Sequence, residues 1–211
     1  MSGVAQTKQA RKPHQSSELV VEDILKSAAI EFAAHGFEGA STRTIADRAG
    51  VFQAQLSYHV GTKDDLWRKT IDWLFLRLRQ ELEKGFVDQM DEPFADAAEV
   101  VADIIRRHVK HTSRHPELSR IMAAEAGMST ERTKYLLNTH VKPTLAALRL
   151  VWMDVQAQGR GKGLEAEDVF MLMIGLAPLP FAQAPLMKSL VGKARCQADA
   201  HAEVLVKLVL G

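Results

Sequence analysis

The fold is decided by residues 40–66, which read ASTRTIADRAGVFQAQLSYHVGTKDDL. Ser41 is a good N-cap for a first short helix, and Gly50 supplies a tight turn because left-handed backbone costs little only for glycine. A second short helix is predicted at about Gln53–His59, and Gly61 interrupts it. Two short helices joined by such a turn have the spacing of a helix-turn-helix, whose second helix lies in the DNA major groove.

The two short helices divide into an inward and an outward set of side chains. Small and aliphatic residues face the core, namely Ile45, Ala46, Ala49, Val51 and Leu56. The outward positions of the second helix are Phe52, Gln53, Ala54, Gln55, Ser57, Tyr58 and His59. Glutamine pairs with adenine, an apolar group contacts the thymine methyl, and hydroxyl, phenol and imidazole groups donate to phosphates. Lys63 opens the next helix, where its ammonium and the free N–H groups favour an anion.

Helical spacing continues on both sides of this stretch, and we find no convincing strand pair. Apolar residues recur at i, i+3 and i+4 steps, which is typical of amphipathic helices. The further helices cover about residues 18–36, 63–84, 96–115, 116–126, 129–158, 165–176 and 194–210. Residues 87–93 interrupt the helical pattern, and Pro143 kinks or restarts the helix in which it lies. The sequence therefore predicts an all-α protein of about nine helices.

The composition excludes several classes of protein. The chain has 211 residues, is 46% hydrophobic and carries a net charge of only +1, which excludes disorder and a purely electrostatic nucleic-acid coat. Cys196 is the single cysteine, so we expect no disulfide framework, no cysteine metal site and a reducing compartment. No apolar run approaches the ~20 residues of a membrane span. We expect a cytoplasmic protein with a flexible basic tail at residues 1–17 that contains Lys8, Arg11 and Lys12.

Several short blocks carry a family resemblance in a fixed order and spacing. They are Ile24–Ala29 with Phe32, Gly36–Phe37, Ser41–Ala46, Ala49–Val51, Leu56–Val60 and Lys63–Leu66. Over about residues 20–67 the chain resembles the N-terminal DNA-binding domain of the TetR family of bacterial repressors. The resemblance implies a helix-turn-helix domain at 18–68 and a helical effector-binding and dimerisation domain at 69–211.

The resemblance also implies roles for individual residues. Arg43 corresponds to a base or phosphate contact, Gln53 and Gln55 to outward recognition positions, and Tyr58 with its neighbours to a phosphate clamp. The predicted DNA-contacting set is Thr42, Arg43, Thr44, Phe52, Gln53, Ala54, Gln55, Ser57, Tyr58, His59 and Lys63. The chain departs from the family at Phe52, where serine frequently caps the helix, at Ser57, where tyrosine is usual, and at Val60, where phenylalanine is usual. Phenylalanine cannot cap, so Phe52 either touches a base methyl or packs on the turn.

The C-terminal part is predicted to form a homodimer. The last helix has one apolar stripe and the helix near residue 170 is apolar nearly all round, which implies burial on two sides. The predicted interface residues are Val169, Leu172, Leu176, Ala198, Ala202, Leu205, Leu208 and Val209. These helices would pair with their copies as a four-helix bundle, an arrangement that the resemblance also implies. The alternative is a core within a single chain.

The resemblance implies an effector cavity in the same domain, whose ligand moves the long helix 63–84. Methionine and aromatic residues suit an adaptable apolar pocket, although they also suit any core. The candidate pocket residues are Phe75, Ile105, His108, Met122, Glu125, Leu136, His140, Trp152, Phe170, Met173 and Phe181.

Other features have a functional and a structural interpretation. His108, His111 and His115 share one helix face and suit a metal site or a protonation switch, but solvated imidazoles near a helix C-terminus are the preferred interpretation. Residues 159–163 resemble a phosphate loop only in their glycines, and an interhelical turn is preferred. For Cys196 we prefer no redox role. We therefore predict no metal and no cofactor.

The function predicted from these patterns is a ligand-responsive, dimeric transcriptional repressor. It would bind a palindromic operator in double-stranded DNA and leave it when an effector enters the C-terminal domain. One alternative is a regulator of the same fold without a small-molecule effector, acting as an activator or under the control of a protein. A helical enzyme using His108, His111 and Glu125 is disfavoured because no nucleophile motif or acid–base pair is found.

Overall fold

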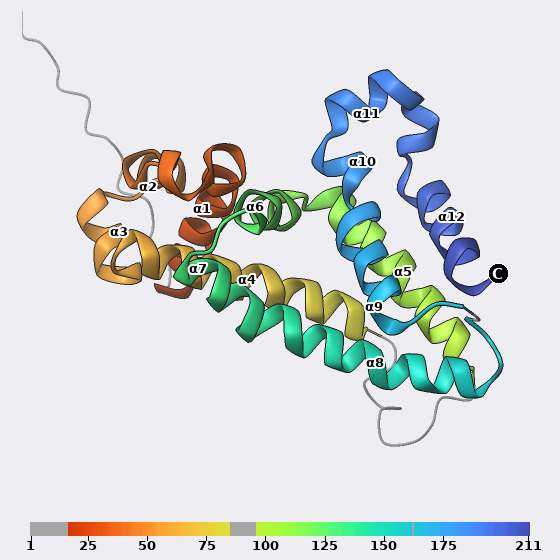
Figure 1. The fold of residues 1–211 in the computed structure, drawn as a ribbon. Helices are drawn as coiled ribbons and strands as arrows, with labels where there is room; N and C mark the ends of the chain where they lie inside the picture. The colour runs from red at the N-terminus through yellow and green to blue at the C-terminus, as the bar shows by residue number, and fades with distance from the viewer. Residues whose placement is uncertain (1–16, 85–95, 162) are drawn as a thin grey trace, which may run out of the picture.

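The computed structural model describes residues 17–84, 96–161 and 163–211, and within these ranges it contains helices and no strand (Figure 1). The α-helices are α1 (Ser17–Gly39), α2 (Thr42–Ala49), α3 (Gln53–Val60), α4 (Lys63–Glu83), α5 (Ala97–Arg114), α6 (Glu117–Ala126), α7 (Glu131–Leu136), α8 (Lys142–Ala157), α9 (Ala166–Met171), α10 (Leu179–Ala182), α11 (Ala184–Val191) and α12 (Ala198–Leu210). The all-α prediction is confirmed. The predicted basic residues of the tail and the interruption at 87–93 lie outside the described residues.

Short-range signals set the ends of the first helices as predicted. The Ser41 hydroxyl accepts a hydrogen bond from the Thr44 N–H at 3.3 Å and caps α2. Gly50 ends α2 in the left-handed region, at a φ of 71°. Thr62 and Asp65 cap α4 reciprocally, the Asp65 N–H bonding to the Thr62 hydroxyl at 3.1 Å and the Thr62 N–H to the Asp65 carboxylate at 3.0 Å. These caps fix the relative orientation of α2, α3 and α4.

The first hydrophobic core lies between α1, α2, α3 and α4. Phe32, Ile45, Leu56 and Trp67 are buried there, and the same core continues onto α6 through Ile121. The helix-turn-helix is therefore not held by its own helices alone. The predicted domain division at residues 68 and 69 falls within α4 and stays a prediction.

The second core joins α5, α8, α9 and α12. Ile105, Trp152, Val169 and Leu205 are buried within it. The α7 helix passes into α8 through a π-helical turn at Leu137–Val141, directly before Pro143 in the first turn of α8. The sequence predicts an irregularity at Pro143, and the structure has it just before the proline. This position is expected because proline has no N–H to bond to the preceding turn of the helix.

Arg132 of α7 lies at the edge of the first core, where α6, α1 and α4 meet. Its guanidinium carbon lies 3.6 Å from the centroid of the Phe37 ring at the end of α1. The same guanidinium contacts three carboxylates, Glu125 at 3.3 Å, Glu38 at 3.4 Å and Asp64 at 4.0 Å. These acids belong to α6, α1 and α4 respectively, so one side chain links the body of the protein to the first turn of α4.

None of the described helices is by itself both long and apolar enough to cross a membrane. Only the bent pair Ala166–Ala182 with Ala184–Val191 meets that test of length and composition, across an 84° bend.

A substitution at Gly161 should show how closely the turn before α9 packs on the second core. A Cβ atom on Gly161 would lie 2.5 Å from the buried Trp152 ring, and its φ is 65°. We expect Gly161→Ala to lower the free energy of unfolding by about 3 kcal/mol, from overpacking and left-handed backbone together. The matched control is Gly163→Ala, at a φ of 83° with open space around it, for which we expect about 1 kcal/mol. Equal losses in urea unfolding would contradict the packing argument.

A second stability experiment concerns the Arg132 pair. Glu125 is only 3% exposed and Arg132 only 11%, so Arg132→Met would leave a buried carboxylate without its cation. We expect a loss of about 3 kcal/mol in the free energy of unfolding, and recovery of most of it when Glu125→Gln is added. The surface pair of Arg149 and Glu167 is the control, and Arg149→Met should cost less than about 1 kcal/mol. The pairing argument fails if the double variant is no more stable than Arg132→Met.

Candidate nucleic-acid interface and effector cavity

The predicted DNA-contacting residues lie on α2, on and just before α3, and at the start of α4, at one end of the molecule (Figure 1). Phe52 is 81% exposed and Tyr58 is 86% exposed, which is unusual for two aromatic side chains within seven residues. Arg43, Thr44, Gln53, Ala54, Gln55 and Ser57 are also exposed, whereas Thr42, His59 and Lys63 are half-buried. Exposed aromatic and amide groups on one short helix are typical of a contact surface.

Two of these residues are hydrogen-bonded within the chain. The Gln55 side-chain oxygen accepts the Phe52 N–H at 3.1 Å and so caps α3. The Phe52 side chain makes no cap, as predicted, and its exposure shows that it does not pack on the turn. The Gln53 amide lies 3.5 Å from the Thr42 hydroxyl. Gln55 is therefore committed to capping α3, whereas the Gln53 amide has one long hydrogen bond and the Phe52 side chain has none.

The cations near α3 hold the fold as well as facing outward. The Lys63 ammonium donates to the Glu38 carbonyl at 3.2 Å and lies 4.9 Å from the Phe37 ring centroid. Lys69, which the sequence did not single out, donates to the carbonyls of His59 and Val60 at 3.3 Å each and caps the C-terminus of α3. No sequence signal identifies it, because Lys69 lies within α4, nine residues after the end of α3.

A buried acid fixes the orientation of α2 on α1. Glu31 accepts hydrogen bonds from the Ser41 N–H at 3.2 Å and from the Arg48 guanidinium at 3.3 Å. Arg48 also donates to the Ser27 carbonyl at 3.2 Å. Sequence reasoning missed this pair, although a carboxylate on the apolar stripe of α1 was a signal for it. The pair positions the first helix of the helix-turn-helix.

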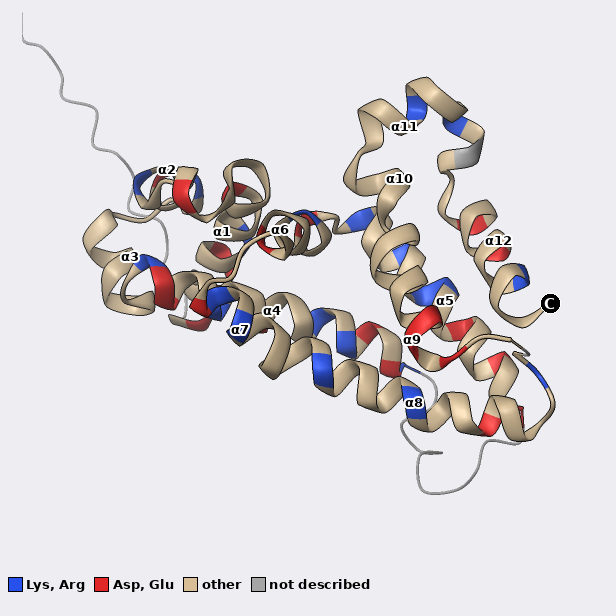
Figure 2. Cartoon of the chain, in the orientation of Figure 1, with Lys and Arg blue, Asp and Glu red and all other residues tan. Residues whose placement is uncertain are grey.

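Charge is sparse on the outward face of α3 (Figure 2). The helix itself contains no Lys, Arg, Asp or Glu, and the charges nearest to it in sequence belong to α2 and the first turns of α4. A contact with DNA at α3 therefore depends on amide, aromatic and hydroxyl groups, while the phosphate charge is met by neighbours such as Arg43.

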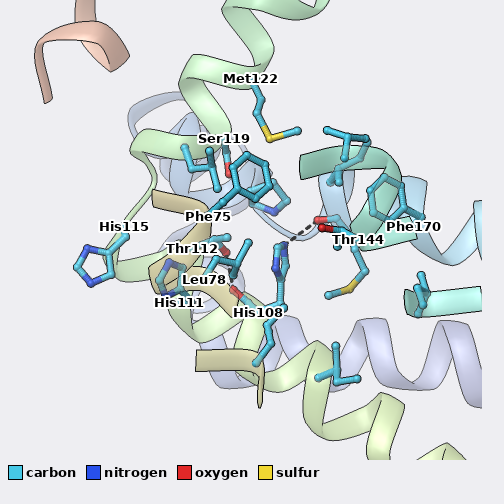
Figure 3. Close-up of a pocket in the computed structure, with 18 residues that line it drawn as sticks. Phe75, Leu78, His108, His111, Thr112, His115, Ser119, Met122, Thr144 and Phe170 are labelled. Atoms are coloured by element: carbon cyan, nitrogen blue, oxygen red, sulfur yellow. Dashed lines mark hydrogen bonds between the residues drawn. The ribbon is translucent and has the colours of Figure 1, made fainter. Parts of the chain in front are cut away.

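An apolar cavity lies in the second part of the chain (Figure 3). Its empty volume is about 820 Å³, which includes space open to solvent. It is bounded by α4, α5, α6, α8 and the helix of residues 166–176. Of the predicted pocket residues, Phe75, His108, Met122, Phe170 and Met173 line it. Its apolar lining suits the apolar part of an organic ligand.

The other predicted pocket residues lie elsewhere. Ile105 and Trp152 belong to the second core, and Leu136 belongs to the first. Glu125 pairs with Arg132. His140 bonds to Asp72 at 2.8 Å and stacks on Phe75, with ring centroids 4.3 Å apart, and Phe181 lies against His201 at 6.0 Å. Size and polarity alone could not separate these core residues from the lining.

The preferred interpretation of the histidine face as solvated is corrected. His108 is buried, and its Nε2 hydrogen-bonds to the Met173 carbonyl at 3.0 Å. Burial lowers the pKa of His108 to about 4 and that of His111 to about 4, and it also lowers the pKa of His115. All three line the cavity because α5 turns this face inward. Among the described residues, no group of three His, Cys, Asp or Glu side chains is placed to hold a metal ion.

The predicted dimer residues are also partly corrected. Val169, Ala202, Leu205 and Val209 are buried within the chain, so a partner cannot cover them. They belong to the second core, in which α12 packs against α5. Leu176 and Leu208 are exposed, and Leu172 and Ala198 are half-buried. On a helix that is apolar nearly all round, periodicity does not tell which side faces the chain's own core.

Two family descriptions match most of the chain. Residues 24–69 match "Bacterial regulatory proteins, tetR family", and residues 98–209 match "Tetracyclin repressor-like, C-terminal domain".

Relatives and solved structures agree with these matches. The chain is 26% identical over 151 residues to the HTH-type transcriptional repressor KstR2 of Mycobacterium tuberculosis (strain ATCC 25618 / H37Rv), covering 70% of each chain. It is similar in fold to the fatty acid degradation regulator FadR from Bacillus halodurans, with a TM-score of 0.65 and 18% identity over 96% of this chain and 97% of that one. It is also similar in fold to apo AibR, with a TM-score of 0.69 and 16% identity over 90% and 98%.

Burial of His108 predicts a pH-dependent stability. The folded-state pKa of about 4 lies below the unfolded value of about 6.5, so the unfolded chain binds more protons below neutrality. Stability is thus complete above pH 6.5 and is lost as the pH falls towards 4. We expect wild type to lose on the order of 2 kcal/mol between pH 7.5 and 5.0 through this residue.

The measurement is urea unfolding at both pH values. His108→Gln keeps a donor for the Met173 carbonyl but does not titrate, so its loss between the two pH values should be smaller by that amount. His35→Gln, at an exposed position of α1, is the matched control and should behave like wild type. Identical pH dependence in all three proteins would show that His108 is not the titrating group.

Proposed function

The chain belongs to the TetR family of bacterial regulatory proteins, and from this premise we propose that it is a dimeric repressor that leaves its operator when a small molecule enters the cavity. The family and the relatives are transcriptional regulators rather than enzymes, and the chain is a DNA-binding regulator. The direction of regulation, the dimer, the palindromic operator and the effector are the proposed parts. We place the protein in the cytoplasm, where the operator would be.

The exposed face of α3 is the observation that carries the DNA-binding proposal. Phe52, Gln53 and Tyr58 project from a helix whose ends are capped and whose neighbour α2 is held on α1 by Glu31. A single eight-residue helix reads only a few base pairs, so two copies are needed for affinity and selectivity. A two-fold dimer would read a palindrome with its two α3 helices.

Exposed apolar side chains support the homodimer. Met171 is 59% exposed, and Ile174 and Leu176 follow it on the exposed side of the helix of residues 166–176. On α12, Val204 and Leu208 are exposed beside the buried stripe that contains Leu205. We propose that these surfaces, rather than the buried stripe predicted at first, pair with their copies in the second subunit.

The cavity and the DNA-binding helices share structural elements, which supports effector control. The α6 helix contributes Leu118 and Met122 to the cavity and Glu125 to the Arg132 cluster. Arg132 in turn contacts Asp64 in the first turn of α4, directly after the helix-turn-helix. A ligand that binds better to a shifted position of α6 would therefore shift the reading helices away from their DNA-binding separation.

A regulator without an effector is the alternative, and the apolar cavity argues against it. The names of the relatives favour repression, since KstR2 is described as a transcriptional repressor. That FadR regulates fatty acid degradation is a statement about that protein, and its 18% identity to this chain shows the fold alone.

The test of DNA binding is a gel-shift titration with fragments from directly upstream of the protein's own gene, at several salt concentrations. Lys63→Ala should weaken binding to all fragments about equally and reduce the slope of log K against log salt by about two per dimer. Gln53→Ala should instead flatten the preference between operator variants. Lys188→Ala, on the exposed surface of α11, is the control and should change neither.

Two results would contradict the assignment. If wild type shows no salt-sensitive binding to any fragment, the regulator proposal fails. If Lys63→Ala and Gln53→Ala change only the free energy of unfolding, the proposed reading face is wrong.

A further inference from the structure

A second, polar hollow adjoins the apolar cavity. His111 and His115 of α5 line both spaces. The polar hollow is otherwise lined by Arg77, Gln80, Glu81 and Lys84 of α4 and by Arg114 of α5. In Figure 3, His115 lies on the far side of the cavity from Phe170. The two spaces therefore share these two imidazoles, with apolar side chains lining one space and cations lining the other.

Among the described residues, only one of the three cations that line this hollow makes an ion pair. Lys84 pairs with Glu81 at 2.6 Å. Neither Arg77 nor Arg114 has a carboxylate within ion-pair distance in the part of the chain that the structure describes. The lining therefore has three cations against one acid. Two unpaired guanidinium groups at the edge of an apolar cavity are a site for an anionic group.

Arg77 is held in position without an acidic partner. Its guanidinium carbon lies 4.7 Å from the Trp73 ring centroid, and its Nη2 lies 3.4 Å from the His115 Nε2. Burial lowers the pKa of His111 to about 4, so at neutral pH the imidazole is an uncharged hydrogen-bonding group. The positive charge at this edge therefore comes from the two arginines.

We propose that the effector is an amphipathic carboxylic acid, whose apolar chain fills the cavity and whose carboxylate lies in the polar hollow between Arg77 and Arg114. This inference rests on the proposed function, since it names the ligand class of the same cavity. Phe75, Met122 and Phe170 contact the apolar chain, and His111 and His115 hydrogen-bond near the head group. Because Arg77 belongs to α4 and Arg114 to α5, the carboxylate draws together the connecting helix and the body of the protein.

The experiment measures direct binding without DNA, by calorimetry and by intrinsic tryptophan fluorescence. The probes are straight-chain carboxylates from octanoate to hexadecanoate and the alcohols of equal length, all below their micelle concentrations. We expect saturable binding of at least one carboxylate, about tenfold or more tighter than its matched alcohol. Equal affinities for acid and alcohol, or no binding of any carboxylate, would overturn the inference.

Variants locate the head group. Arg77→Gln and Arg114→Gln should each weaken carboxylate binding about tenfold and leave alcohol binding unchanged. Arg79→Gln, on the same helix but outside both spaces, is the matched control and should bind carboxylates like wild type. If all three variants behave alike, or if acid and alcohol weaken together, the carboxylate does not lie between these arginines.

This design separates the two proposals. If carboxylates bind but the gel shift shows no operator, the ligand class stands and the repressor proposal fails. If the operator is bound and a neutral apolar compound releases it while carboxylates do not bind, the repressor proposal stands and the ligand class fails.

Discussion

The contact between Arg132 and Phe37 connects the helices that line the cavity to the helix-turn-helix, and the proposed coupling between the two depends on it. Lys63 approaches the same ring at 4.9 Å, so cations from α7 and α4 share one aromatic side chain at the end of α1. The ring in turn lies parallel to that of Phe32, in the first core, at 6.1 Å. A cation over an aromatic face gains from both charge and contact area, and it tolerates small sliding motions better than a directional hydrogen bond does. These contacts therefore tie α7 to the end of α1 and to the start of α4.

The attachment of the helix-turn-helix also bears on how a chain with almost no net charge can bind DNA. The net charge of +1 argues against binding through charge alone. The reading helix contains no charged side chain, and its neighbours Lys63 and Lys69 also serve as internal donors. In the proposed dimer, affinity would come from neutral contacts of each α3 helix and from binding two half-sites at once, and the second of these depends on the distance between the two α3 helices. DNA binding of this kind is sensitive to small displacements of the helices that hold α3.

Much of the helix-turn-helix could be predicted from the sequence because its signals are local. Ser41, Gly50 and Thr62 act on residues within one turn, so their effect can be read from neighbouring letters. The inward position of His108 and the burial of Leu205 could not be predicted in the same way. Both depend on which side of a helix meets another helix far along the chain, and apolar residues occur on several sides of these helices. The Arg132 cluster escaped notice for the same reason, since its partners come from three separate helices.

The ion pairs of Arg132 differ in strength, and this difference suits a conformational switch. Coupling between two binding sites is typically about 1–3 kcal/mol, which is less than the cost of breaking a buried ion pair. Glu125 is buried beside Arg132, whereas Glu38 and Asp64 are exposed and lie at 3.4 and 4.0 Å. A ligand that moves α6 would therefore carry Arg132 along with Glu125, because that pair is the costly one to separate. The contacts that change are the weak outer ones, and these are the contacts that reach α1 and the first turn of α4.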